Sequence, residues 1–175
     1  NIKNKTVLIT GAGGSIGSEI ARQVARNNPK TLILLDANEF ALYEIRNEIE
    51  STLLNTSLKT IIASVTNKKR VSKVCQTFAV DTIYHSAAYK HVPLVEENPF
   101  EGVFNNIIGT KACVEAAIES KVGTFVLIST DKAVRPTNIM GATKRFAEMI
   151  LQSYSDDKNL GNVTRMTMVR FGNVL

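Results

Sequence analysis

The chain has 175 residues, a net charge of +5, 44% hydrophobic residues and 21% charged residues. A chain of this length buries one hydrophobic core, and no apolar run approaches the roughly 20 residues of a transmembrane helix, so neither several domains nor a membrane span is expected. The one basic run, Lys68–Arg70, has no interleaved aromatic residues, which favours a solvated helix start over a nucleic-acid surface.

Apolar runs of strand length alternate with helical periods along the whole chain. Strands are predicted at residues 6–10, 31–35, 61–65, 81–88, 124–129 and 163–171, and helices at 16–24, 42–53, 71–78, 99–121 and 138–154. Near-continuous apolar strands joined by helices of this length are typical of a parallel sheet covered on both faces, with right-handed crossovers. The sequence therefore predicts one doubly wound α/β domain, a Rossmann fold, over residues 1–175.

A glycine-rich turn, TGAGGSIG, follows the first predicted strand. Gly11 permits the tight turn, Gly14 lets the backbone approach a pyrophosphate, and Gly17 lets the following helix pack closely on the strand. Gly13 adds a further flexible position. This spacing is the phosphate-binding pattern of dinucleotide-binding domains, although a glycine-rich turn alone is weak evidence.

The start of the following helix and an acidic residue downstream extend the predicted cofactor site. Free backbone N–H groups at Ser15 and Ile16 are expected to bind the phosphates. Asp36 ends the second strand about 20 residues after the last glycine, where its carboxylate would accept hydrogen bonds from the adenosine ribose and repel a 2′-phosphate. Ala37 offers no cation for that phosphate, so NAD is predicted rather than NADP. The alternative is a tight turn followed by an acidic helix cap.

The ends of the third and fourth strands provide the rest of the predicted cofactor site. Ser64 and Val65 would border the adenine. Ala87 and Ala88 are small and would leave room for the nicotinamide side of the cofactor.

Three other residues are interpreted as core residues. Cys75 and Cys113 lie on apolar helical faces and are expected to be buried thiols, not a disulfide or a metal pair. His85, inside a predicted strand, is interpreted as a core histidine. No group of His, Cys and carboxylate residues has metal-ligand spacing, so no metal is expected.

Four motifs, TGAGGSIG, YHSAAYKHVPLVEENP, STDKAVRPTNIMGATKR and RFGNVL, follow one another in this order. Together they resemble the extended short-chain dehydrogenase/reductase superfamily and, within it, the CapD-like polysaccharide-biosynthesis nucleotide-sugar 4,6-dehydratases. The resemblance spans essentially the whole chain. The glycine motif is widespread, whereas TDKAVRPTN-x-MG-x-TK is specific to this group. The resemblance implies NAD as cofactor and a UDP-N-acetylhexosamine, UDP-GlcNAc first, as substrate.

The predicted chemistry lies at the carboxyl end of the fifth strand. Asp131 and Lys132 are adjacent there and have opposite charges, at the edge of the sheet where this fold binds ligands. Formation of a 4-keto-6-deoxy sugar needs a base for the C5 proton and an acid for the departing C6 hydroxyl. The resemblance assigns Asp131 as the acid at O6 and Lys132 as the base at C5. The alternative is a turn cap at Asp131 and a solvated loop charge at Lys132.

Met140 stands where short-chain dehydrogenases usually have a tyrosine, four residues before Lys144. A thioether cannot accept a proton. Lys144 can still hydrogen-bond the nicotinamide ribose, and Thr130, with Asp131 behind it, is the candidate relay for the C4 hydroxyl proton. The alternative is that Met140 only packs the helix and the chemistry lies elsewhere. The resemblance makes Met140 typical of larger, membrane-anchored members.

The resemblance also places three residues next to the substrate. Lys90 and His91, after the fourth strand, are similar to the family's substrate-side loop, and Asn173, after the sixth strand, is similar to a ligand of the UDP diphosphate. An ordinary loop histidine is an equal alternative for His91. Ser64 departs from relatives that often have Asp at its position, which predicts a weaker adenine contact.

The predicted function is NAD-dependent dehydration of UDP-GlcNAc to a UDP-4-keto-6-deoxy sugar for polysaccharide biosynthesis. The alternatives are a nucleotide-sugar 4-epimerase or reductase, and a non-catalytic module that binds NAD(H) and a partner. The chain is expected to be a cytoplasmic fragment that lacks upstream membrane segments and a downstream sugar-binding segment. A homo-oligomer, a dimer or larger, is expected to pair through the helices at 99–121 and 138–154.

Overall fold

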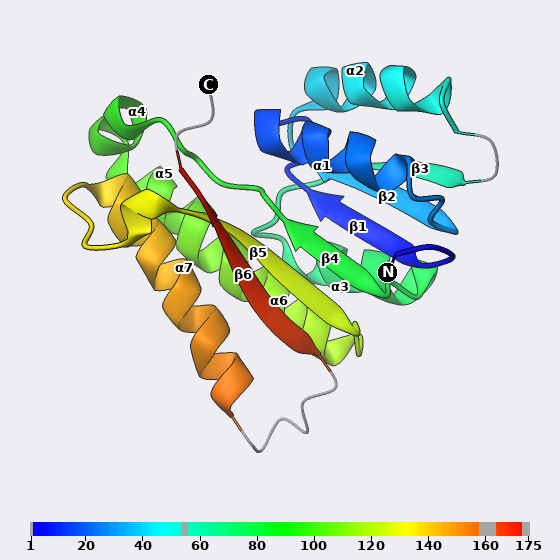
Figure 1. Cartoon of the computed structure of the whole chain (residues 1–175). Coiled ribbons are helices and arrows are strands. Elements are labelled where there is room, and N and C mark those ends of the chain that lie inside the picture. The colour runs from blue at the N-terminus through cyan, green and yellow to red at the C-terminus, as the bar shows by residue number, and fades with distance from the viewer. Residues whose placement is uncertain (1, 54–55, 158–163, 173–175) are drawn as a thin grey trace.

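Six parallel strands form one sheet in the order β3-β2-β1-β4-β5-β6 (Figure 1). The computed structural model describes residues 2–53, 56–157 and 164–172. The strands are β1 (Thr6–Thr10), β2 (Thr31–Asp36), β3 (Ser57–Ile62), β4 (Thr82–His85), β5 (Thr124–Thr130) and β6 (Arg165–Phe171). The α-helices are α1 (Ser15–Ala25), α2 (Glu39–Glu50), α3 (Lys68–Phe78), α4 (Val92–Glu97), α5 (Pro99–Val103), α6 (Gly109–Glu119) and α7 (Ile139–Asp156), with a π-helical segment (Phe104–Ile108) and a 3₁₀ turn (Asp131–Ala133).

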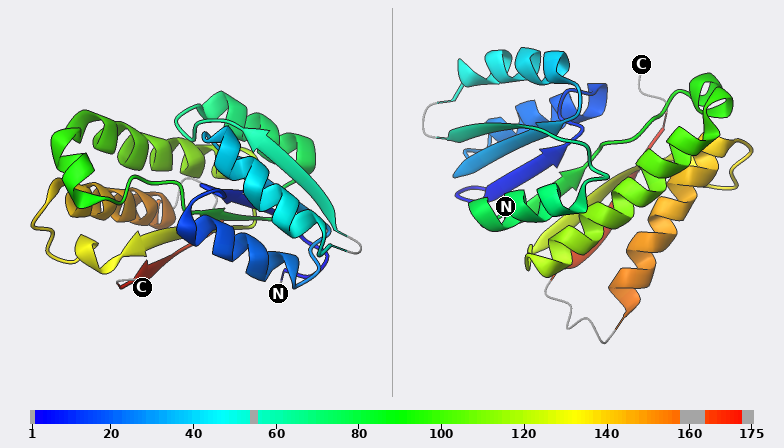
Figure 2. Two further views of the ribbon diagram at one scale, coloured as in Figure 1. Left: turned by 90° about the horizontal axis from the view of Figure 1, so that it is seen from above. Right: turned by 180° about the vertical axis from the view of Figure 1, so that it is seen from behind.

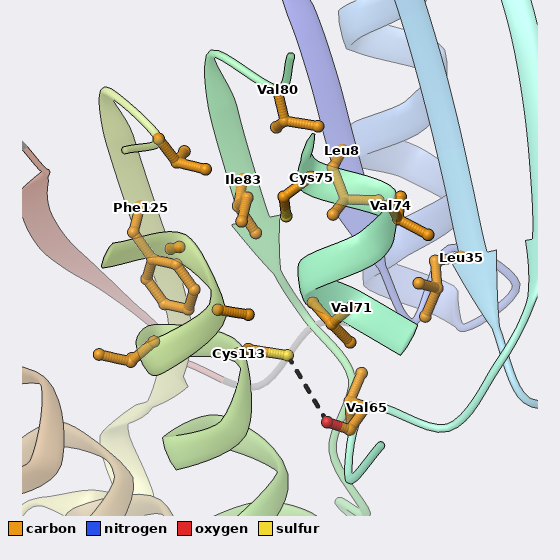
Figure 3. Close-up of a cluster of buried hydrophobic side chains, with 14 of the residues drawn as sticks. Leu8, Leu35, Val65, Val71, Val74, Cys75, Val80, Ile83, Cys113 and Phe125 are labelled. Carbon is orange, nitrogen blue, oxygen red and sulfur yellow. Dashed lines mark hydrogen bonds between the residues drawn. The ribbon is translucent and has the colours of Figure 1, made fainter. Parts of the chain in front are cut away.

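Helices cover both faces of the sheet (Figure 2). α1 and α2 pack on one face of β1 and β2, and α3, α6 and α7 pack on the opposite face of the sheet. Because successive side chains of a strand point to opposite faces, Val7 and Ile9 join the α1–α2 core while Leu8 joins the other core (Figure 3). The predicted doubly wound α/β fold is confirmed.

The predicted core residues lie where the sequence placed them. Cys75 and Cys113 are buried free thiols in the core between the sheet and helices α3 and α6, and Cys113 Sγ lies 3.9 Å from the carbonyl oxygen of Val65 (Figure 3). His85 is 1% exposed at the end of β4. The interpretation of these three residues as core residues is therefore confirmed.

The third strand was predicted at 61–65, but the structure places β3 at Ser57–Ile62. β3 is an edge strand that pairs with β2 alone among the described strands, so its residues are exposed or only partly buried instead of forming a buried apolar run. The apolar residues after it are buried for another reason. Val65 is 4% exposed because it packs under α6, near Gly109, and not because it belongs to the strand. The predicted strand was shifted toward this loop.

The predicted helix at 99–121 is divided into α5, the π-helical segment and α6. The segment Phe104–Ile108 adds one residue to a helical turn, which turns Asn106 into the protein, where it is 1% exposed. A helical period read from the sequence assumes 3.6 residues per turn throughout and cannot reveal this change.

β6 forms the other edge of the sheet and pairs with β5. Its Met166 and Met168 are partly buried against the core under α6 and α7. Val169 and Phe171, on the other face, are 42% and 37% exposed. Among the described helices, none is long and apolar enough to cross a membrane.

The close approach of α1 to the glycine turn yields a stability prediction. A Cβ at Gly17 would collide with the carbonyl oxygen of Gly11 and come within 2.7 Å of Ser86 Oγ. We expect Gly17→Ala to lower the free energy of unfolding by about 1–3 kcal/mol or more, because backbone must move to admit the methyl group. The matched control is Gly172→Ala, since a Cβ there meets no atom within 4 Å. Urea denaturation of both variants measures the effect, and equal stability of the two would contradict this account.

Candidate functional site

Two adjoining cavities open at the carboxyl ends of the strands, where the strand order reverses between β1 and β4. The larger has a volume of about 760 Å³ and the smaller about 440 Å³. Both are lined by Gly11 and Gly14 of the glycine turn and by Ala88 and Tyr89 after β4. Ligands of open α/β sheets bind at such a reversal point, so the two cavities together form the candidate site.

Most of the residues predicted from the sequence line these cavities. The larger cavity is lined by Gly11, Gly14, Ser15, Ile16, Gly17, Ala88, Lys90, His91, Thr130, Lys132, Met140 and Lys144. The smaller cavity is lined by Gly11, Gly13, Gly14, Asp36, Ala37, Ser64, Val65, Ala87, Ala88 and His91. Asp131 lines neither cavity and adjoins the larger one through its neighbours. Asn173 lies outside the described residues.

The glycine turn has the shape that a dinucleotide requires. Gly11 has a φ of +67°, which side-chain-bearing residues rarely adopt, and a Cβ there would lie 2.6 Å from the Cα of Ala87. Gly14 is the N-cap of α1 and has no side chain to cap it, so the first N–H groups of the helix face the cavity. The turn therefore presents free N–H groups, with no side chain at Gly11 or Gly14, as a pyrophosphate would need.

Asp36 ends β2 beside the glycine turn. Its Oδ2 accepts a hydrogen bond from the Gly13 N–H at 2.9 Å, and its Oδ1 accepts one from the Asn38 N–H at 2.9 Å. The carboxylate therefore fixes the turn in addition to being available to a ribose. Asn38, not Asp36, caps α2 by accepting from the Ala41 N–H, so the alternative of an acidic helix cap at Asp36 is wrong.

The carboxyl end of β5 brings three polar groups together. Thr130 Oγ1 donates to Asp131 Oδ1 at 3.0 Å, and Lys132 Nζ lies 3.5 Å from the same oxygen. The hydrogen bond from Thr130, followed by the charge of Lys132, holds the pKa of Asp131 below its usual range. Asp131 is therefore a carboxylate that faces a hydroxyl on the wall of the larger cavity. Such a group can draw a proton through that hydroxyl.

Lys144 and Met140 form the neighbouring wall, on α7. Lys144 is 8% exposed, and its Nζ donates to the carbonyl oxygen of Ile128 at 2.6 Å. Burial lowers the pKa of Lys144 to about 8, although the negative charge of Glu148 partly opposes this shift. Met140 is 3% exposed and lines the cavity one turn before Lys144, so it shapes this wall as well as packing the helix.

The segment after β4 crosses from one cavity to the other. Lys90 Nζ lies 3.3 Å from Ser15 Oγ, at the start of α1. Lys90 therefore stands beside the predicted phosphate position as well as on the wall of the larger cavity. His91 lines both cavities and is the N-cap residue of α4.

Asn106 holds this segment in place, and it was not predicted from the sequence. Its Oδ1 accepts from the Tyr89 N–H at 2.8 Å, and its Nδ2 donates to the Tyr89 carbonyl oxygen at 2.9 Å and to Thr143 Oγ1 at 3.0 Å. Asn106 thus ties the segment after β4 to α7, beside Lys144. The available signal was an amide in the middle of an apolar helical run.

A second buried network joins the strands under the site. His85 contacts Thr10 Oγ1 through Nδ1 at 2.7 Å and Thr110 Oγ1 through Nε2 at 3.0 Å. Burial, together with the charge of Lys144, lowers the pKa of His85 to about 3, so the ring is neutral at physiological pH. The network connects β1, β4 and α6 directly below the glycine turn.

The chain is similar to known proteins over almost its whole length. A family model described as polysaccharide biosynthesis protein matches residues 7–175. The capsular polysaccharide biosynthesis protein CapD of Staphylococcus aureus is 51% identical over 99% of this chain, which covers 29% of CapD. An inverting UDP-N-acetylglucosamine 4,6-dehydratase of Campylobacter jejuni is 32% identical over 98% of this chain and 49% of its own length. A UDP-glucose 4-epimerase of Rickettsia canadensis is also 32% identical, over 98% of this chain and 50% of its own length.

A solved structure shares the fold over almost the whole chain. Pen from Bacillus thuringiensis superposes with a TM-score of 0.91 and 37% identity, over 99% of this chain and 52% of Pen. The chain thus spans between about a third and a half of the proteins it matches.

The buried amine of Lys144 predicts a pH dependence of stability. Its pKa falls from 10.5 to about 8 on folding, so between these values the folded chain binds fewer protons than the unfolded chain. Stability contributed by this residue therefore rises with pH. Relative to Lys144→Met, the wild type should gain about 3 kcal/mol in the free energy of unfolding between pH 8 and 10.5.

Urea denaturation at several pH values measures the free energy of unfolding of both proteins. The titration of groups that both proteins share cancels in the difference. Lys69→Met, at an exposed lysine of α3, is the control and should show no such gain. A difference between wild type and Lys144→Met that stays constant over this pH range would contradict the assigned pKa.

Proposed function

Because the chain belongs to the family of polysaccharide biosynthesis proteins, we propose that it is the NAD-binding domain of a nucleotide-sugar 4,6-dehydratase. The proposed substrate is a UDP-N-acetylhexosamine, with UDP-GlcNAc as the leading candidate, and the product is the UDP-4-keto-6-deoxy sugar. The observation that carries this proposal is the cluster of Thr130, Asp131 and Lys132, in which Thr130 and Lys132 line the larger cavity together with the glycine turn.

The residues of the smaller cavity fit NAD. The glycine turn and the uncapped start of α1 receive the pyrophosphate, and Asp36 receives the adenosine ribose. Ala37 provides no positive charge for a 2′-phosphate. When bound, NAD⁺ accepts the hydride from C4 of the sugar and later returns it to C6. Lys144 would hydrogen-bond the nicotinamide ribose from the larger cavity.

In the first step, Thr130 and Asp131 would take the proton of the C4 hydroxyl. Met140 cannot do so, since its thioether does not titrate. Thr130 Oγ1 already donates to Asp131 Oδ1 at 3.0 Å, so the hydroxyl can pass its own proton to the carboxylate as it receives the proton from O4. Asp131 ends this step protonated, and C4 becomes a ketone.

In the second step, the ketone makes the C5 proton acidic and Lys132 would remove it. Because Asp131 is now neutral, it no longer stabilises the Lys132 ammonium 3.5 Å away, so the ammonium releases its proton to solvent and the neutral amine accepts the C5 proton. Asp131 returns its proton to the departing C6 hydroxyl, which leaves as water. In the last step, C6 receives the hydride and Lys132 returns its proton to C5. Asp131 is then a carboxylate again, and Lys132 takes up a proton from solvent to regain its starting charge.

A 4-epimerase is the second candidate, because an epimerase and a dehydratase are equally similar to this chain. Epimerisation inverts C4 only and needs neither an acid at O6 nor a base at C5. The adjacent Asp131 and Lys132 therefore favour the dehydratase. NMR of the product distinguishes the two, since only dehydration replaces the C6 hydroxyl with a methyl group.

We also propose that the domain pairs with a second copy through α5, the π-helical segment and α7. Phe100, Phe104, Phe146 and Met149 are between 49% and 86% exposed there. Large apolar side chains gathered on neighbouring helices are typical of a protein–protein contact.

The experiment that tests the proposed function is Lys132→Ala in the full-length protein. The variant should still transfer hydride from UDP-GlcNAc to NAD⁺, so absorbance of bound NADH should accumulate at 340 nm, while solvent deuterium fails to enter C5. Loss of a positioned base typically costs about 10²–10⁴-fold in rate. The control is Lys69→Ala, at an exposed lysine of α3. Exchange at C5 at the wild-type rate would show that Lys132 is not the base.

A second prediction concerns cofactor choice. Asp36→Ala should weaken NAD binding by about 1–3 kcal/mol through lost charge-assisted hydrogen bonds, and should narrow the preference for NAD over NADP by removing the repulsion of the 2′-phosphate. Calorimetric titration of the 175-residue chain with both dinucleotides measures the ratio of the two dissociation constants. An unchanged ratio, with the fold intact by circular dichroism, would refute the role of Asp36.

A further inference from the structure

A buried carboxylate lies one helical turn beyond Lys144, and the chemistry proposed above does not use it. Glu148 of α7 is 1% exposed. Its Oε1 accepts from Ser129 Oγ at 2.7 Å and from Arg170 Nε at 2.8 Å, and its Oε2 accepts from Arg170 Nη2 at 2.8 Å and from Arg145 Nη1 at 3.1 Å. We refer to Glu148, Ser129, Arg145 and Arg170 as the Glu148 cluster.

The Glu148 cluster joins the three elements that form one wall of the larger cavity. Ser129 lies in β5 next to Thr130, and Arg170 lies in β6 directly before Phe171 and Gly172, which line the cavity. Glu148 itself lies on α7, the helix that carries Met140 and Lys144. The side chain of Glu148 thus links three elements: β5, which ends at Thr130, α7, which carries Lys144, and the end of β6.

The position of β6 makes this contact necessary. Ser129 and Arg170 are paired in the β5–β6 register, and Glu148 bonds to both members of the pair. β6 is an edge strand whose last residues, Val169 to Phe171, are exposed. Few apolar contacts therefore hold this end of the strand, and the bidentate pair of Arg170 with Glu148 provides a directional one.

Glu148 remains ionised despite its burial. Burial alone would raise the pKa of Glu148, but hydrogen bonds from Arg170, Ser129 and Arg145 lower it to about 2. Its charge also favours the protonated form of Lys144, one turn away. The carboxylate is therefore charged throughout the physiological pH range.

We propose that Glu148 is a positioning residue for the sugar end of the site: it fixes the end of β6 and the Lys144 segment of α7 against β5. It touches neither substrate nor cofactor and acts through Ser129, Arg170 and the backbone they belong to. This inference rests on the proposed function for its substrate, but the contact and its effect on β6 stand apart from it.

The role predicts a split between the two ends of the site. The adenosine end is built on β1, β2 and the glycine turn, which lie in the other half of the sheet. Loss of Glu148 should therefore weaken UDP-GlcNAc binding and turnover much more than NAD binding, in which only the contact of Lys144 with the nicotinamide ribose depends on α7. A purely structural ion pair would lower thermal stability without this selectivity.

The test is Glu148→Gln in the full-length protein, which keeps the shape of the side chain and removes its charge. Amide hydrogen exchange of residues 165–171 should become faster while that of β1 and β2 stays unchanged. The dissociation constant of UDP-GlcNAc should rise, and turnover fall, by about 10–100-fold, as for a small displacement of positioning groups. Glu148→Asp should recover part of the loss. Arg170→Lys, made in the otherwise wild-type protein, should show the full loss, because an amine cannot replace the two parallel hydrogen bonds of the guanidinium group.

Two variants serve as controls. Glu48→Gln breaks another bidentate pair, with Arg22 at 2.6 and 2.9 Å between α1 and α2, away from the larger cavity. Ile49→Ala removes a buried side chain from the α1–α2 core and lowers stability without touching the cluster. Neither should change UDP-GlcNAc binding or the exchange of residues 165–171 selectively.

The experiment separates failure of the proposal for Glu148 from failure of the proposed function. The proposal is overturned if Glu148→Gln leaves both the exchange of residues 165–171 and UDP-GlcNAc binding unchanged, or if Ile49→Ala reproduces both effects at an equal loss of melting temperature. If the wild type binds no UDP-sugar, the proposed function is wrong. In that case, selective exchange in β6 still decides whether Glu148 positions this wall.

Discussion

The parallel pairing of β1 with β2 on one side and β4 on the other is the constraint on which the rest of the molecule depends. Parallel strands place all their carboxyl ends at one edge, and the reversal of strand order at β1 leaves that edge open. The glycine turn, Asp36 and the Thr130 segment are far apart in the chain, yet this arrangement brings them to the same two cavities. The buried contacts of His85 with Thr10 and Thr110 hold the strands together at that point.

The two ends of the site are stabilised by different forces. The adenosine end rests on strands whose side chains are almost completely buried on both faces, so hydrophobic packing keeps it rigid. The other end rests on an edge strand and on segments after β4 and β5, and polar side chains fix it: Asn106 holds Tyr89 and Thr143, and Glu148 holds Ser129 and Arg170. An end built from directional polar contacts is better suited to orient reacting groups, because hydrogen bonds fix angles as well as distances.

The sequence predicted those features whose signal is local. The spacing of the glycines and the distance to Asp36 are set within one βαβ unit, and the order of elements follows from alternating apolar runs. The limits of β3 were missed because burial of Val65 comes from α6, which is distant in the sequence. Asn106 and Glu148 were missed for the same reason: each resembles an ordinary polar helix residue until the partners on other elements are known. The hydrogen bond from Thr130 to Asp131 also depends on the 3₁₀ turn, which no periodicity indicates.

The π-helical segment Phe104–Ile108 limits how this region can change in length. A π-helical turn holds about one residue more than an α-helical turn, so loss of one residue here would restore a regular turn and change which side chains within the segment face the protein. The helix would survive, but Asn106 would leave Tyr89, and the segment with Lys90 would lose its anchor. Substitutions on the outer surface of this helix leave that geometry intact. Insertions and deletions alter it, so divergent descendants of this sequence should vary here in residue identity while keeping the same number of residues.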